Sequence, residues 1–188
     1  MASTPPKPLP PASTLPSLPT ETQTSILAAL FEPSPALSTT LSPLLTTPHQ
    51  TYATLITAIQ THLLSLRATN PSLLLEILSS HPRLGAPKVD SAQSAAEQAQ
   101  LQGDARVEEL RVLNEEYEAK FPGLRFVVFV NGRGRGEIVE VMRERIARAD
   151  WGKERDGAIE VSLSVSLLPK PHSLFLLPFL EFHLAAFA

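Results

Sequence analysis

Residues 51–66 read TYATLITAIQTHLLSL, and this stretch holds the clearest helical pattern in the chain. Thr47-Pro48 precedes it and predicts the helix start, because proline at the first helical position lacks only an N–H that would be unpaired anyway. Large apolar side chains then recur three or four positions apart, on one side of an α-helix: Tyr52, Leu55, Ile56, Ile59, Leu63 and Leu66. About four turns of such a stripe predict a helix that buries one face in a core.

Similar signals predict helices on both sides of this stretch. Thr20 and Gln23 resemble a capping box ahead of a short helix that ends near Glu32-Pro33. Asn70-Pro71 predicts a third helix, over 73–78. Its end would deliver Ser79, Ser80 and His81 to a loop.

Helical spacing returns in the second half of the chain, over 107–117 and again over 137–148. The first of these helices is expected to close at Phe121-Pro122-Gly123. Residues 124–130, LRFVVFV, are aromatic and β-branched, are too few for a typical helix, and precede an Asn-Gly turn. An extended segment is therefore expected there.

The two ends of the chain differ from its middle. Residues 1–19 hold seven of the eighteen prolines, which fix φ and lack donors, so a disordered leader without a secretory signal is expected. Residues 161–188 have only two charges, are broken by prolines, and show neither helical nor strand periodicity. This tail is also too interrupted to span a membrane. The sequence predicts one domain over 20–160 between these two ends.

A gene-model error would explain the atypical tail. Val161-Ser162 can be encoded by codons that match a splice-donor consensus, so residues 161–188 could be translated intron. This is a hypothesis that sequencing of the transcript would settle.

Composition narrows the classes of function. A net charge of −3 and a pI near 6.0 argue against a nucleic-acid binder, which needs a clustered basic excess. The chain has no cysteine, which removes disulfides, thiolate nucleophiles and thiolate metal sites. Of the 35 charged side chains 28 lie in 81–160, so the polar chemistry is expected there.

The stretch 81–98, HPRLGAPKVDSAQSAAEQ, is the candidate site. His81 precedes Pro82, which pushes it out of the helical region, so the imidazole should lie at a helix-to-loop corner. Ser94, Glu97 and Gln98 open the following helix, and their polar groups could converge with the imidazole on an acid/base pocket. The alternative for Ser94 and Glu97 is a capping box, which has the same spacing.

The sequence evidence for a metal site or a phosphate-binding site is weaker. The five histidines show no metal-binding spacing, so no metal site is expected. The glycine-rich run after 124–130 fails the spacing of both common phosphate-binding motifs. A phosphate-binding α/β protein stays open only if 124–130 is a central parallel strand. Arg133 and Arg135 are candidates for binding an anion such as a carboxylate, or are solvated loop residues.

Several motifs in order resemble the 2-oxo-4-hydroxy-4-carboxy-5-ureidoimidazoline (OHCU) decarboxylase family. The resemblance covers about 20–160 and is strongest from His81 onward. The motifs are His81-Pro82, Ser94-x-x-Glu97-Gln98, Leu113-Asn114-x-x-Tyr117, Lys120-Phe121-Pro122, Phe126-Val127-Val128 and Gly132-Arg133-x-Arg135-x-Glu137-Ile138.

The resemblance implies an all-α, single-domain decarboxylase that converts OHCU to (S)-allantoin in urate breakdown. It implies no metal or organic cofactor and, by family analogy, a homodimer. The charge and the interrupted tail predict no nucleic-acid or membrane partner. The resemblance places the proton-donating histidine on His81, an assisting carboxylate on Glu97, and substrate contacts on a set of further positions. That set is Pro82, Ser94, Gln98, Phe126, Val127, Val128, Phe129 and Val130. Arg133, the anion candidate named above, is added to the predicted substrate contacts.

The chain departs from the family pattern in two places. Relatives continue past the position of Glu160 with a charged helix that contributes an arginine near the site, and the tail replaces it here. Arg83 stands where relatives have an aspartate after His-Pro, and it is expected to face solvent. A peroxisomal or a cytoplasmic location stays open, since the chain ends Ala-Ala-Phe-Ala and not S-K-L. The alternative function is a non-catalytic helical interaction protein or an inactive, truncated family member.

Overall fold

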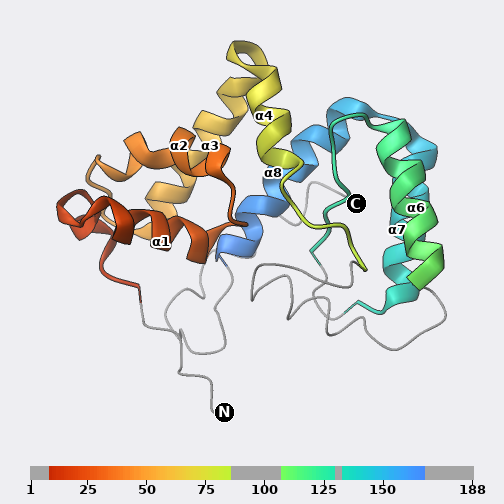
Figure 1. Cartoon of the computed structure of the whole chain (residues 1–188), viewed down its shortest axis with the longest axis horizontal. Coiled ribbons are helices and arrows are strands. Elements are labelled where there is room, and N and C mark those ends of the chain that lie inside the picture. Colours follow the sequence, from red (N-terminus) through yellow and green to blue (C-terminus); the bar gives the residue numbers. More distant parts are fainter. Residues whose placement is uncertain (1–8, 86–106, 130–132, 168–188) are drawn as a thin grey trace, which may run out of the picture.

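The fold comes from a computed structural model, in which residues 9–85, 107–129 and 133–167 are described. Every regular element in these residues is a helix (Figure 1), which confirms the expected all-α class. In chain order the elements are η1 Ala12–Ser17, α1 Thr20–Leu30, α2 Pro35–Leu45, α3 Tyr52–Thr69, α4 Pro71–Leu78, α6 Val107–Lys120, α7 Arg135–Arg148 and α8 Trp151–Leu167.

The long helix α8 connects two groups of helices. Figure 1 shows α1 to α4 on one side and the pair α6 and α7 on the other, with α8 running between them. α8 packs on α3 and α4, while α6 packs on α7. Apolar residues from both groups and from α8 belong to one buried cluster, so the described residues share a single core.

Helix α3 follows the apolar stripe that the sequence predicts. Leu55, Ile56, Ile59, Leu63 and Leu66 are all buried. The predicted start at Thr47-Pro48 is wrong, because Thr51 caps the helix by accepting from the Thr54 backbone N–H at 3.2 Å. The threonine hydroxyl accepts a hydrogen bond from this N–H group, whereas a proline side chain has no acceptor to offer it.

The N-terminal region differs from the predictions in two respects. Helix α1 is confirmed, but its capping box is wrong: Gln23 is buried and donates from Nε2 to the Leu15 carbonyl at 2.8 Å. That bond holds part of the N-terminal leader in place. The leader was predicted to be disordered, but residues 12–17 form a 3₁₀-helix with Leu15 in the core. The short turn tolerates Pro16, and burial of Leu15 offsets the cost of ordering it.

The segment 124–129, between α6 and α7, is neither helix nor strand. The α/β alternative needed a central strand here, so it is wrong for these residues. Helix α6 closes before Gly123, whose φ of +84° suits glycine, and this confirms the predicted turn. Helix α7 confirms the predicted second-half helix and begins two residues earlier than expected, at Arg135.

Two helices were not foreseen. Helix α2 begins after Ser34, whose hydroxyl accepts from the Leu37 backbone N–H at 3.3 Å, with Pro35 at the first position. Helix α8 continues past Glu160 to Leu167, although no helical periodicity was evident after residue 160. Leu163 is buried in the core, so residues just after 160 pack with the domain.

A buried carboxylate joins α8 to the pair α6 and α7. Glu154 on α8 has no exposed surface and accepts from Tyr117 Oη on α6 at 2.7 Å. It also accepts from Arg145 Nε on α7 at 2.7 Å and from Arg148 Nη2 at 2.6 Å. Burial alone would raise the pKa of Glu154, but the hydrogen bond and charge of Arg145 outweigh it and hold the pKa below its usual value. Glu154 is therefore ionised and fully partnered.

The same arginine fixes the segment 124–129. Arg145 Nη1 donates to the Val127 carbonyl at 2.8 Å, and its guanidinium lies 4.7 Å from the centre of the Phe126 ring. One side chain thus ties α7 and α8 to an irregular segment that has no ladder of its own.

Replacement of Glu154 by glutamine should lower the free energy of unfolding by about 3 kcal/mol, because two guanidinium groups would lose their buried countercharge. Urea denaturation followed by circular dichroism measures the change. Glu140→Gln is the matched control: this carboxylate on α7 is 65% exposed and pairs with Arg143 at 2.7 Å. The control should cost less than about 1 kcal/mol. Equal losses in the two variants would contradict the role given to Glu154.

Candidate functional site

His81 lies at the corner where α4 ends and a loop begins, as predicted. The Ser80 N–H and hydroxyl both donate to the Ile77 carbonyl, at 3.2 and 2.7 Å, and so close the last turn of the helix. Pro82 then prevents a further helical turn at His81. The imidazole is therefore presented by a short, hydrogen-bonded corner.

Helix α6 holds the loop that follows His81. The buried Asn114 donates from Nδ2 to the Leu84 carbonyl at 2.9 Å. Arg83 is exposed, as expected, and donates from Nε and Nη2 to the two carboxylate oxygens of Glu118, each at 2.7 Å. These bonds fix the loop on its far side, so the position of His81 is set from both directions.

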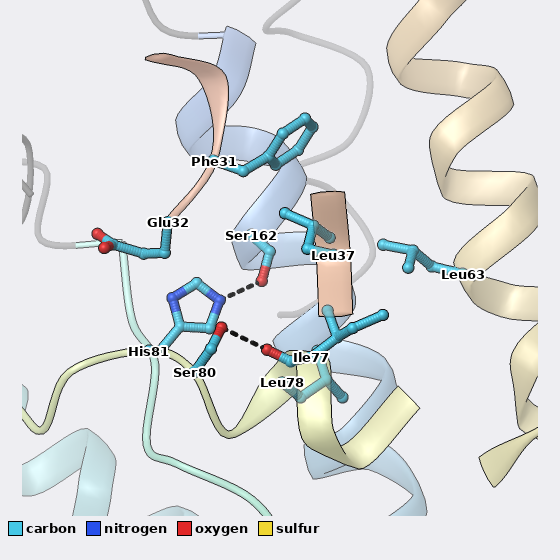
Figure 2. A pocket seen from close by; sticks show the side chains of 9 residues that line it. All are labelled: Phe31, Glu32, Leu37, Leu63, Ile77, Leu78, Ser80, His81 and Ser162. Carbon is cyan, nitrogen blue, oxygen red and sulfur yellow. Dashed lines mark hydrogen bonds between the residues drawn. The ribbon is translucent and has the colours of Figure 1, made fainter. Parts of the chain in front are cut away.

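A pocket with an empty volume of about 330 Å³ opens beside His81 (Figure 2). Its wall comes from four helices and two of their connections, and it is mostly apolar. This volume includes open solvent at the mouth of the pocket, so it is an upper limit on the enclosed space. The lining residues are Phe31, Glu32, Leu37, Leu63, Ile77, Leu78, Ser80, His81 and Ser162.

Polar groups face the imidazole from two elements. His81 Nε2 lies 2.7 Å from Ser162 Oγ on α8. Figure 2 shows the other ring nitrogen on the side of Glu32, which follows α1. Burial lowers the pKa of His81 below its usual value, and the negative charge of Glu32 opposes this shift. The imidazole is thus a neutral group at neutral pH in a largely apolar pocket.

Only some of the predicted site residues can be placed. Pro82 is partly buried next to His81, Val128 and Phe129 are partly buried, and Arg133 is exposed. Ser94, Glu97, Gln98 and Val130 lie outside the described residues. The predicted meeting of His81 with Glu97 therefore stays a prediction.

Phe126 and Val127 serve the core in the described structure. The Phe126 ring is 3% exposed, packs edge-on against Tyr117 at 5.4 Å and lies under Arg145. In both figures the chain of 124–129 crosses the loop that carries His81. Among the described residues, however, the pocket lining does not include these two side chains.

Two polar residues of the pocket were not predicted from the sequence. Glu32 had a usable signal, because Glu32-Pro33 ends a helix in the same way as His81-Pro82. Ser162 had none, since it lies in a stretch without visible helical periodicity. Among the described residues, the buried Nε and Nη1 atoms of Arg135, a candidate for anion binding, have no hydrogen-bond partner.

Within 9–85, 107–129 and 133–167 no cluster of three histidine or acidic side chains could hold a metal ion. In that part of the chain no helix has both the length and the apolar character that a membrane span requires.

Comparison with solved structures finds a similar fold. The crystal structure of an (S)-allantoin synthase matches with a TM-score of 0.55 and 19% identity, over 84% of this chain. The chain spans only 51% of that protein's length, and an identity this low supports likeness of fold alone. No curated protein sequence matches the chain significantly.

The match to a protein family is more specific. Residues 16–164 match the family described as OHCU decarboxylase. This matched range includes the corner with His81 and all the lining residues of the pocket. The matched region also extends past residue 160 and includes Leu163 of α8, which is buried in the core. The chain therefore belongs to the OHCU decarboxylase family.

Proposed function

We propose that this chain decarboxylates OHCU to (S)-allantoin without a metal or an organic cofactor. The observation that carries the proposal is His81, whose imidazole forms part of the wall of a small, mostly apolar pocket in a member of this family. The position of this histidine agrees with the acid/base role that its sequence motif implies.

The decarboxylation requires a pocket that fits the substrate and one group that donates a proton. Loss of CO₂ breaks a carbon–carbon bond and leaves its electron pair on the ring, where the imine and carbonyl system spreads it. A proton delivered to one face of the ring then takes up that pair and sets the handedness of the product. An imidazole held at one wall of the pocket supports delivery from one side.

The remaining roles follow the family motif. Glu97 would orient the imidazole or assist its protonation, while Ser94, Gln98 and the main-chain amides of 127–130 would hold the polar atoms of the ring. Pro82 and the side chains of 126–130 would shape the wall, and Arg133 would attract the substrate carboxylate. Arg145 supports this arrangement, because it fixes the Val127 carbonyl and with it the path of 124–129.

The protonation state of His81 places a condition on the mechanism. Since burial lowers its pKa, the imidazole is neutral at neutral pH before substrate binds. An anionic substrate beside the ring would raise the pKa again, because a nearby negative charge favours the charged imidazole. Substrate binding would therefore prepare the proton donor.

Replacement of His81 by glutamine should lower kcat by about 100-fold or more, because the proton donor is removed. The rate is followed by the disappearance of freshly generated OHCU, against the uncatalysed reaction. His62→Gln on α3 is the matched control, since His62 is partly exposed and is not a lining residue of the pocket. A His81→Gln variant that is folded and as active as the control would reject the role of His81.

The lowered pKa of His81 also predicts a pH dependence of stability. Below about pH 6.5 the unfolded chain binds a proton at this histidine that the folded chain resists, so stability falls as the pH drops. Between pH 7 and 5 the free energy of unfolding should fall further in the wild-type chain than in His81→Gln. Urea titrations across this window measure the difference; parallel falls would show that His81 is not shielded from protonation.

A further inference from the structure

The hydroxyl of Ser162 makes two contacts that together determine where its proton lies. Ser162 Oγ donates to the Ala158 carbonyl one turn earlier on α8, at 2.7 Å. The same oxygen lies 2.7 Å from His81 Nε2. A hydroxyl has one proton but two lone pairs, so an oxygen that donates to a carbonyl can only accept from the imidazole.

This proton count fixes the form of the imidazole. Nε2 must carry the ring proton in order to donate to Ser162, and Nδ1 is then the nitrogen without a proton in the neutral ring. Figure 2 shows Nδ1 turned to the side of Glu32, away from Ser162. The two ring nitrogens therefore face different elements and have different roles.

The supporting helix holds the hydroxyl in place. Leu163, the next residue on α8, is buried in the core, and α8 packs on both α3 and α4. His81 is held by the closed last turn of α4 and by the loop bonds to α6. Neither partner can turn away easily, so a single tautomer is favoured over the other.

We propose that Ser162 is a positioning residue that holds His81 in the tautomer with the proton on Nε2, which leaves Nδ1 as the position that exchanges protons during catalysis. The tautomer itself is a property of the folded chain. Its catalytic consequence rests on the proposed decarboxylase function, so the two are tested by separate readouts.

The first readout is the ¹⁵N NMR spectrum of histidine-labelled protein at pH 7.5, with the His81 signals assigned by their absence in His81→Gln. In the wild-type chain Nδ1 should resonate as an unprotonated ring nitrogen and Nε2 as a protonated one. In Ser162→Ala the two signals should move toward each other, because the acceptor at Nε2 is lost, and in Ser162→Thr they should keep their wild-type positions. A proton on Nδ1 in the wild-type chain, or an unchanged tautomer in Ser162→Ala, would overturn the proposal.

The second readout is the kinetics with OHCU. Ser162→Ala should lower kcat by about tenfold with KM little changed, in proportion to one hydrogen bond, and Ser162→Thr should restore it. Ser42→Ala is the matched control, because Ser42 is also partly buried and donates to a carbonyl four residues earlier, at 2.7 Å, but is not a lining residue of the pocket. An equal loss of kcat in Ser42→Ala, or no rescue by threonine, would reduce Ser162 to a structural role.

The two readouts separate this proposal from the function on which it rests. If no form of the chain accelerates OHCU decarboxylation but the tautomer shifts as described, the proposed function fails while the positioning by Ser162 stands. If the chain is active and the tautomer does not respond to Ser162, the function stands and the positioning is wrong.

Discussion

The buried carboxylate of Glu154 is the contact on which the arrangement of the helices depends. It holds Tyr117 of α6 and Arg145 and Arg148 at the end of α7 against the first turns of α8. Such a cluster has strict geometry, because each charge must be partnered once it leaves water. Ser162 lies eight residues further along the same helix, about 12 Å away. The contacts of Glu154 therefore fix the position of α8 along its axis. This position determines where the Ser162 hydroxyl lies relative to His81.

The pocket is made by helix ends more than by helix faces. Glu32 and His81 each precede a proline and each follow the end of a short helix, and both side chains line the same pocket. A residue before proline leaves the helical region, so the chain turns there while the side chain stays near the helices it has just left. The apolar floor from α2, α3 and α4 then gives these polar groups a poorly hydrated setting. That setting is what lowers the pKa of His81.

Helices with a long apolar stripe could be predicted from the sequence, since the stripe of α3 reflects burial that its own residues require. Helix starts were less predictable, because several polar residues near each start could accept the first N–H groups. Thr51 took that place ahead of Pro48, and Gln23 turned to the leader instead of capping α1. The position of His81 followed from the His-Pro pair alone. The contributions of Glu32 and Ser162 depend on how distant helices pack, which local spacing does not record.

If the His81 pocket directs a proton to one face of the substrate ring, the product must have a single handedness. Freshly generated OHCU is mixed with the wild-type chain, and circular dichroism of the product is followed to completion beside a sample without protein. Delivery of the proton from His81 should give rapid formation of (S)-allantoin alone. A folded chain that leaves a racemic product forming at the uncatalysed rate would contradict it.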